Sequence, residues 1–141
     1  MSKVYNSFSY DETLDIGVRL ASNLKGNEVI ALFGGLGMGK TALTTGIAKG
    51  FGAENCVSSP TFAIVNEYHG KAAIYHFDMY RINTFDDLYT TGFFDYMDNG
   101  VMVIEWSENI ESALPEGCIR VYIKVISENE REIEIEGAEE I

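Results

Sequence analysis

The chain has 141 residues, of which 46% are hydrophobic, and this length and composition predict one compact domain, residues 1–141. The 22 acidic and 10 basic residues give a formal net charge of -12, which opposes direct binding to an RNA or DNA backbone. No segment approaches the roughly 18 apolar residues that a membrane-spanning helix needs, and "MSKVYNSFSYDE" lacks the apolar run of a secretory signal. We therefore expect a cytoplasmic protein without a membrane partner. Cys56 and Cys118 belong to no CxxC motif, which predicts reduced thiols.

The first third of the chain predicts a helix, a strand, a glycine-rich loop and a second helix, in that order. Ser9 and Glu12 have the S-x-x-E spacing of a capping box. Apolar residues then recur at helical spacing: Leu14, Val18, Ala21 and Leu24. Residues 27–33, "NEVIALF", form a short apolar run between glycines, which predicts a buried strand. From Thr41 the sequence predicts a helix of about three turns, ending near Gly50 or Gly52.

The rest of the chain predicts two hairpins, a short helix and a second buried strand. Two β-rich runs on either side of Gly70, in "SSPTFAIVNEYHGKAAIYHFDMYRI", indicate an antiparallel hairpin. The segment "NTFDDLYTTGFFDYM" is partly helical, with a Thr or Asn cap and two early aspartates, and "GVMVIEW" is the strand. The alternating runs "CIRVYIKVI" and "REIEIEG" predict a closing hairpin. We interpret the acidic tail as a solvated strand face with a frayed end.

The glycine-rich loop carries the clearest chemical signal. Residues 34–41, "GGLGMGKT", fit G-x-x-x-x-G-K-[ST] between a strand and a helix, which predicts a phosphate-binding loop. In such a loop the backbone N–H groups surround a phosphate, and the helix N-terminus adds partial positive charge. Lys40 can reach the β- and γ-phosphates, and the Thr41 hydroxyl can bind Mg²⁺. The pattern G-x-G-x-x-G is not present, which argues against a nicotinamide enzyme.

Hydrolysis or transfer of a phosphoryl group also needs carboxylates near the metal. With Lys40, the candidate catalytic residues are Asp78 and Glu105. Glu105 ends the strand "VMVIE", where it can lie beside Thr41 and complete the metal shell, or can be an ordinary exposed glutamate. Asp78, in "YHFDMYR", can orient water or hold magnesium through its shell, or can accept from Arg81. Whether Asp78 or Glu105 positions the attacking water is open at this point.

Three further residues have both a functional and a structural interpretation. Thr61 lies in a segment that could close over the γ-phosphate, although a plain turn also accounts for Pro60. His76, between Tyr75 and Phe77, is better interpreted as a hydrogen-bonded, partly buried histidine than as a catalytic base. Trp106 is expected in the core, close to the site if Glu105 is there.

Four segments, in this order and spacing, resemble the TsaE (YjeE) family of small bacterial P-loop ATPases: "GGLGMGKT", "SSPTFAIVNEY", "YHFDMYRI" and "VMVIEWSE". The resemblance extends from the first helix to Pro115. It implies a three-layer α/β P-loop NTPase fold with a mixed parallel and antiparallel central sheet. It also implies a magnesium-dependent ATPase that binds the TsaB–TsaD heterodimer and supports threonylcarbamoylation of the adenosine next to the anticodon in tRNA. The tRNA would be held elsewhere in that complex, which fits the acidic composition.

The resemblance also implies positions for the nucleotide, ATP or ADP. It places the phosphates on consecutive loop residues: Leu36, Gly37, Met38, Gly39, Lys40 and Thr41. It assigns magnesium to Thr41 and Glu105, and Asp78 to the γ-phosphate or its water. Thr13 would lie near the adenine or ribose.

Two positions depart from the usual loop of the family. Gly35 replaces a common aspartate, which leaves the backbone cradle intact. Ala42 replaces a common hydroxyl residue, so only its amide N–H remains for the α-phosphate. We therefore expect somewhat weaker nucleotide binding in this chain.

Two other functions use the same loop. A small-molecule kinase needs an acceptor pocket and usually an arginine-bearing lid, and the sequence offers few arginines: Arg19, Arg81, Arg120 and Arg131. A nucleotide-gated binding module would use ATP only to order residues 59–61. Free ATP turnover favours the ATPase, transfer to a metabolite favours the kinase, and binding without turnover favours the module.

Overall fold

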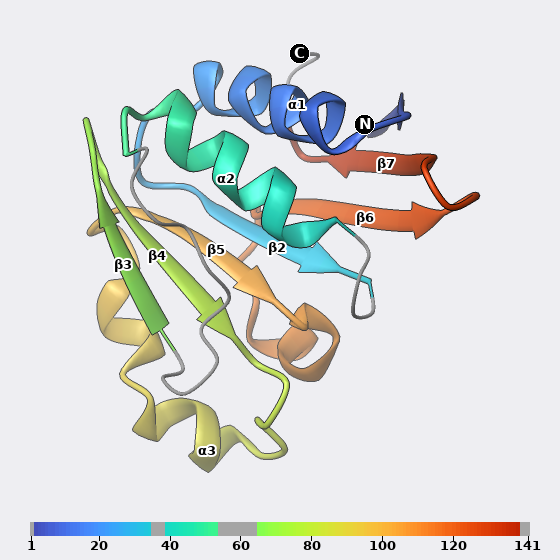
Figure 1. Cartoon of the computed structure of the whole chain (residues 1–141). Helices are drawn as coiled ribbons and strands as arrows, with labels where there is room; N and C mark the ends of the chain where they lie inside the picture. Colours follow the sequence, from blue (N-terminus) through green and yellow to red (C-terminus); the bar gives the residue numbers. More distant parts are fainter. Residues whose placement is uncertain (1, 35–38, 54–64, 139–141) are drawn as a thin grey trace.

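The computed structural model describes residues 2–34, 39–53 and 65–138, which form a seven-stranded sheet with helices on both faces (Figure 1). The first half contains β1 (Ser2–Ser7), α1 (Tyr10–Ser22), β2 (Val29–Phe33), α2 (Lys40–Gly50), β3 (Val65–His69) and β4 (Ala73–Asp78). The second half contains α3 (Phe85–Thr90), the 3-10 helix η1 (Phe93–Tyr96), β5 (Val101–Glu105), the 3-10 helix η2 (Ser107–Ala113), β6 (Ile119–Val125) and β7 (Arg131–Glu136). The strand order is β1-β7-β6-β2-β5-β4-β3.

The centre of the sheet is parallel and its two sides are antiparallel. β2 pairs in parallel with β5 and β6, and β4 pairs in parallel with β5. The antiparallel pairs are β1 with β7, β6 with β7, and β3 with β4. Every residue of β2 and β5 is buried, as expected for parallel strands with both faces covered. This arrangement confirms the mixed-sheet α/β fold and both predicted hairpins.

Helices on each face make the fold three-layered. On one face, α1 and α2 pack through Leu20 and Leu43 against Ile30 and Leu32 of β2. On the other face, α3, η1 and η2 pack through a second cluster that includes Leu88, Phe93, Ile110, Phe77 and Ile104. The carboxyl ends of β2, β4 and β5 meet at one edge, where parallel α/β sheets usually bind ligands.

The first helix begins where the sequence predicts, but its buried face differs. Ser9 caps α1 by accepting from the Glu12 amide at 3.1 Å, and the Glu12 carboxylate accepts from the Phe8 amide at 3.1 Å. The fully buried residues of α1 are Thr13, Ile16, Gly17, Leu20 and Ala21. Except for Ala21, the predicted apolar stripe is only half-buried. The sequence therefore predicted the wrong buried face for α1. The backbone of α2 approaches α1 so closely that the contact needs a glycine, and the face of α1 with Thr13 and Gly17 is turned toward α2.

Two elements were not predicted from the sequence. β1 is a short, largely exposed strand without apolar alternation, and it adds to β7 at the edge of the sheet. η2 follows β5 through Trp106, whose backbone is left-handed with φ 59°. In neither element do apolar residues recur at the spacing of a helix or a strand, so the sequence pattern does not indicate it.

The described part of the chain includes one of the two cysteines. Cys118 is a free, half-buried thiol, and burial raises its pKa. Cys56 lies outside the described residues. Within the three described ranges, no helix has the length and apolar character needed to cross a bilayer.

The contact between α1 and α2 depends on glycine. A Cβ at Gly46 would overlap the carbonyl oxygen of Leu14, and a Cβ at Gly17 would overlap that of Leu43. The two backbones therefore touch directly, which fixes the amino-terminal ends of both helices relative to each other. A Cβ at Gly39, which precedes α2, would lie 3.8 Å from Cγ2 of Thr13.

We expect Gly46→Ala to lower the free energy of unfolding by about 1–3 kcal/mol, because overlap with Leu14 outweighs a gain in helix propensity of about 1 kcal/mol. Urea unfolding measures this change. Lys49→Ala, at an exposed position of the same helix, is the matched control and should leave the midpoint almost unchanged. An equal midpoint for Gly46→Ala and wild type would contradict the close approach.

Candidate functional site

The amino-terminal end of α2 lies at the carboxyl edge of the parallel strands. Gly39 is its N-cap, with a left-handed backbone at φ 91°, and has no side chain to accept from the first amides of the helix. The first turn of α2 therefore presents backbone donors and the positive end of the helix dipole. This geometry suits an anion, as the sequence motif predicts.

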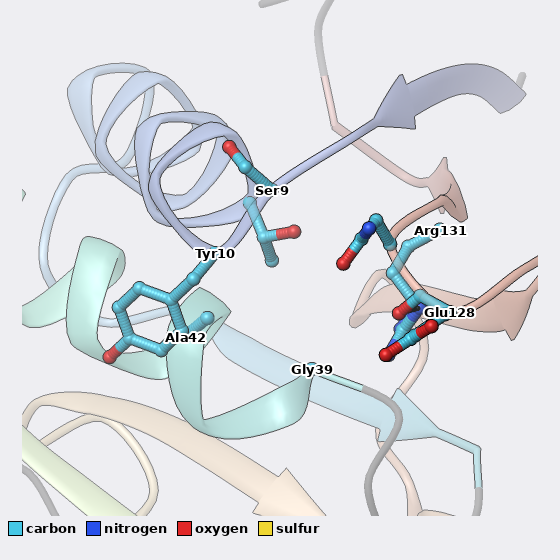
Figure 2. A pocket seen from close by; sticks show the side chains of 8 residues that line it. Ser9, Tyr10, Gly39, Ala42, Glu128 and Arg131 are labelled. Atoms are coloured by element: carbon cyan, nitrogen blue, oxygen red, sulfur yellow. Dashed lines mark hydrogen bonds between the residues drawn. The ribbon is translucent and has the colours of Figure 1, made fainter.

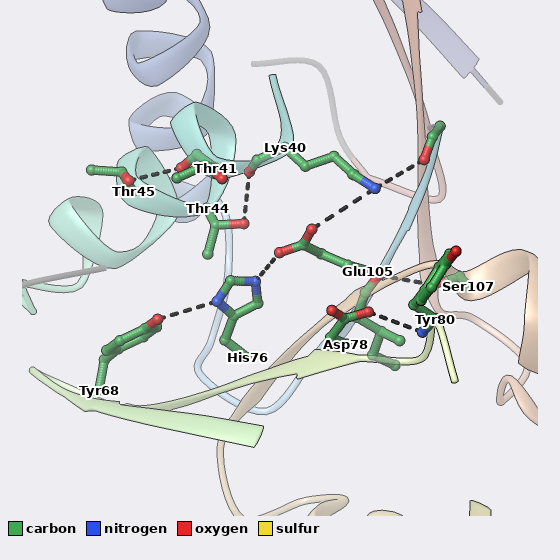
Figure 3. A network of polar contacts seen from close by, with 12 residues as sticks. Lys40, Thr41, Thr44, Thr45, Tyr68, His76, Asp78, Tyr80, Glu105 and Ser107 are labelled. Carbon is green, nitrogen blue, oxygen red and sulfur yellow. Dashed lines mark hydrogen bonds and ion pairs between the residues drawn. The ribbon is translucent and has the colours of Figure 1, made fainter. Parts of the chain in front are cut away.

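Lys40 is buried directly behind this helix end (Figure 3). Its side chain is 5% exposed, and its Nζ donates to the Gly34 carbonyl at 2.9 Å. The same Nζ lies 3.8 Å from Oε1 of Glu105 and 4.7 Å from the centre of the Trp106 ring. The lysine cation is thus held between the ends of β2 and β5.

Glu105 is bound on its other side by a buried histidine. Nε2 of His76 donates a hydrogen bond to Oε2 of Glu105, because an ionised carboxylate can only accept. On the other side of the imidazole ring, the Tyr68 hydroxyl lies 3.2 Å from Nδ1 of His76. Glu105 is 6% exposed and His76 is fully buried, so the alternative of an exposed strand-end glutamate is wrong. The interpretation of His76 as a hydrogen-bonded histidine is confirmed, although the side chain is fully rather than partly buried. Its contact with Glu105 was missed, and only the pairing of β4 with β5 brings the two together.

Asp78 lies beside Glu105, opposite it in the parallel register of β4 and β5. It is half-buried, and its Oδ1 accepts from the Tyr80 amide at 2.9 Å, which forms a local turn. Among the residues that the structure describes, no ion pair joins Asp78 to Arg81. The alternative role of Asp78 as an acceptor for Arg81 is therefore not found.

The turn after β5 contacts the start of the glycine motif. The left-handed backbone of Trp106 directs the chain into η2, and buried Ser107 donates from Oγ to the Ile104 carbonyl at 2.9 Å. Oε2 of Glu108 accepts from the Gly34 amide at 3.1 Å. The sequence analysis did not identify Glu108 as part of the site. An acidic residue three positions after Glu105 gives no sign that it contacts Gly34, which is far away in the chain.

A cavity of about 320 Å³ lies beside the amino-terminal end of α2 (Figure 2). Its walls come from α1, α2 and the turn between β6 and β7: Ser9, Tyr10, Thr13, Gly39, Ala42, Glu128, Asn129 and Arg131. The buried Thr13 hydroxyl lies 2.7 Å from Oγ of Ser7. Arg131 holds the turn by donating to the carbonyls of Ser127, Glu128 and Glu130. The contribution of this turn was not predicted, because no motif marks it.

The structure brings the predicted residues together in two groups. Lys40, Glu105 and Asp78 meet at the carboxyl edge of the sheet, and Thr13, Gly39 and Ala42 line the cavity. Thr41 is exposed on the first turn of α2. The remaining predicted residues lie outside the described ranges: Leu36, Gly37, Met38 and Thr61.

The oxygen donors at this edge fit a hard cation such as Mg²⁺, which takes carboxylate and hydroxyl oxygens. The candidate groups are the Asp78 carboxylate, the Glu105 carboxylate, which already contacts Lys40 and His76, and the Thr41 hydroxyl on the first turn of α2. In the described segments, no group of three or more His, Cys, Asp or Glu side chains could hold a metal ion. A cation here would therefore depend on few protein ligands, as Mg²⁺ does when phosphates and water complete its shell.

Comparisons with known proteins identify a single family. The family model "Threonylcarbamoyl adenosine biosynthesis protein TsaE" matches residues 7–133. The tRNA threonylcarbamoyladenosine biosynthesis protein TsaE of Treponema pallidum is 35% identical over 130 residues, covering 92% of this chain and 96% of the relative. The protein of the same name from Bacillus subtilis is 39% identical over 125 residues, covering 87% and 78%. The crystal structure of Bacillus subtilis YdiB superposes with a TM-score of 0.77 at 34% identity, covering 96% of this chain and 84% of that one.

We expect His76→Leu to lower the free energy of unfolding by about 1–3 kcal/mol, because the buried Glu105 carboxylate loses its hydrogen-bond donor. His69→Leu is the matched control, since His69 lies on the same hairpin but is exposed. Thermal or urea unfolding of the two variants should separate them clearly. Equal midpoints for both variants and wild type would refute the stabilising role of the contact between His76 and Glu105.

Proposed function

Because this chain belongs to the TsaE family, we propose that it is a single-domain, magnesium-dependent ATPase that acts in tRNA threonylcarbamoyladenosine biosynthesis. Family membership supports the part in that biosynthesis. One structural observation carries the proposed ATPase activity: a buried lysine at the start of a helix, set against a carboxylate at the end of the neighbouring strand. Phosphoryl transfer needs such a cation close to a metal-binding acid.

The proposed phosphate site is the first turn of α2 with the loop before it. Lys40 lies within 3.8 Å of Glu105 without a closer contact to it, and its other partner is a backbone carbonyl. We infer that Lys40 exchanges these contacts for the β- and γ-phosphates of ATP. The backbone of Leu36, Gly37 and Met38 would complete the cradle.

The proposed metal ligands are Thr41 and Glu105, and Mg²⁺ would neutralise charge on the transferred phosphoryl group. Asp78, beside Glu105, would orient the attacking water, and Thr61 would close over the γ-phosphate. His76 keeps Glu105 turned toward Lys40. These roles follow from the positions of the two carboxylates at the strand ends and from the family resemblance.

The cavity beside α2 is the proposed site of the nucleoside. It adjoins Gly39 at the start of α2, and Thr13 and Ala42 form its walls. A nucleoside there would continue from phosphates on the first turn of the helix. This supports the assignment of Thr13 to the adenine or ribose.

The proposed partner is the TsaB–TsaD heterodimer, with tRNA reached only through the complex. A formal net charge of -12 supports this indirect contact with RNA, because the surface would repel a phosphate backbone.

We expect purified TsaB and TsaD to stimulate phosphate release from ATP by the wild-type chain, and Lys40→Ala to lower that release by about 10²-fold or more. Lys49→Ala, an exposed lysine of the same helix, should retain full activity. Release that survives in Lys40→Ala would refute the proposed loop. Transfer of the phosphoryl group to an added metabolite would replace the ATPase with the kinase.

We expect Ala42→Thr to bind a fluorescent ADP analogue about five- to tenfold more tightly, because a hydroxyl in the cavity wall can donate to the α-phosphate. Ala42→Val has nearly the same shape without the hydroxyl and should not gain affinity. Equal affinity of Ala42→Thr and wild type, or an equal gain in Ala42→Val, would contradict this prediction.

A further inference from the structure

The face opposite α1 and α2 carries an exposed group of aromatic side chains. We define the α3 aromatic surface as Phe85 and Tyr89 of α3 with Phe94 of η1. Phe85 is 65% exposed and Tyr89 is 67% exposed, while Phe94 is half-buried. The ring centres are 5.8 to 6.5 Å apart, so the three rings form one continuous patch. Contiguous exposed aromatic surface of this kind marks an interaction site more often than a solvated helix.

The patch is anchored in the core. The ring of Phe94 packs edge-on against Phe93 at 5.2 Å, and Phe93 packs edge-on against Phe77 of β4 at 5.5 Å. Phe93 and Phe77 are fully buried. Thr84 caps α3 by accepting from the Asp87 amide at 3.0 Å, which fixes the start of the helix. The ring of Phe94 and the backbone of α3 are thus fixed before any partner arrives, which lowers the entropy cost of binding.

The charge around the patch selects its partner. The exposed charged residues of α3, η1 and the turn after η1 are all acidic: Asp86, Asp87, Asp95 and Asp98. The one described cation that adjoins α3 is Arg81, which lines a shallow pocket with Asp87. Asp86 and Asp87 lie on α3, and Asp95 lies in η1. An RNA or an anionic membrane would be repelled, and a second copy of this chain would place like charges together. A protein with basic residues around an apolar groove satisfies both the rings and the carboxylates.

We propose that the α3 aromatic surface is the docking site for a basic protein partner. Phe85 and Tyr89 enter an apolar groove on the partner, and Lys or Arg side chains at the rim of that groove face Asp86 and Asp95. An arginine of the partner can also stack on the exposed rings. The inference rests on the proposed function for the identity of this partner, the TsaB–TsaD heterodimer.

The docking surface adjoins the strand that carries Asp78. Six residues separate Asp78 from Phe85. The Met79 amide donates to the Glu105 carbonyl at 3.0 Å, and the Asn109 side chain donates to the carbonyls of Met79 and Tyr80 at 2.8 and 3.2 Å. A partner on α3 would therefore lie next to Met79 and Tyr80. These residues are hydrogen-bonded to β5 and η2 at the edge of the proposed catalytic site.

The test measures binding of purified TsaB–TsaD to the wild-type chain and to a Phe85→Ser/Tyr89→Ser variant, at low and high salt. We expect the double variant to bind at least about tenfold more weakly, because exposed aromatic anchors dominate interfaces. Phe8→Ser removes a ring that is 55% exposed near the start of α1 and should change the affinity less than twofold. Asp86→Lys/Asp95→Lys keeps the rings, and we expect it to weaken binding and to reduce the salt dependence.

The outcomes separate this inference from the proposed function. Binding by wild type with equal affinity in both double variants would overturn the docking surface alone. No binding by wild type would remove the proposed partner, and the docking inference with it. Sedimentation that finds a wild-type dimer, dissolved by Phe85→Ser/Tyr89→Ser, would make the surface a contact between copies and overturn the inference. Unchanged affinity of the variants for a fluorescent ADP analogue, with weakened TsaB–TsaD binding, would support it.

Discussion

The site depends on a lysine and a glutamate that are both more than nine-tenths buried, Lys40 and Glu105. Removing two charges from water costs several kcal/mol for each ion, so such a pair is tolerated only when further hydrogen bonds satisfy it. The Gly34 carbonyl supplies one such bond to the lysine, and His76 supplies one to the carboxylate. Because these four residues come from the chain just after β2, the start of α2, β4 and β5, the ion pair requires the parallel centre of the sheet to be correctly assembled. The Lys40–Glu105 distance of 3.8 Å is longer than a hydrogen bond, so the proposed phosphates would not have to break a close contact between these two side chains.

The two antiparallel hairpins add separate walls to this parallel centre. The hairpin of β3 and β4 contributes Tyr68 and His76, which together support Glu105 from below the site. The hairpin of β6 and β7 extends past the amino-terminal end of α2, and its turn closes the cavity beside Gly39. Neither hairpin contains a phosphate-binding motif. Their contribution comes from pairing on either side of the central strands, which places distant segments against the same helix end.

Sequence reasoning succeeded where a feature is local. The capping box at Ser9, the buried strands and both hairpins follow from patterns a few residues long, and the fold class follows from their order. Sequence reasoning was incomplete where the contacts join residues that are far apart along the chain. The buried face of α1 is set by Gly17 touching α2, and the role of His76 is set by strand register. The walls of the cavity at Glu128 and Asn129 come from a turn about 90 residues after the motif, which no local period can reveal.

The two faces of the sheet differ in charge as well as in packing. On the side of α1 and α2, the buried cation of Lys40 lies at the start of α2. On the other side, the exposed charged residues of α3 and η1 are acidic: Asp86, Asp87 and Asp95. The proposed phosphate ligand would be attracted to Lys40 and repelled by these carboxylates. Asp78 ends β4 beside Glu105, and α3 follows it in the chain after six residues. The proposed basic partner would therefore neutralise carboxylates close to Asp78 without contacting the proposed phosphate site. If both proposals hold, the proposed nucleotide and the proposed partner would approach the end of β4 from different sides and would not compete for the same residues.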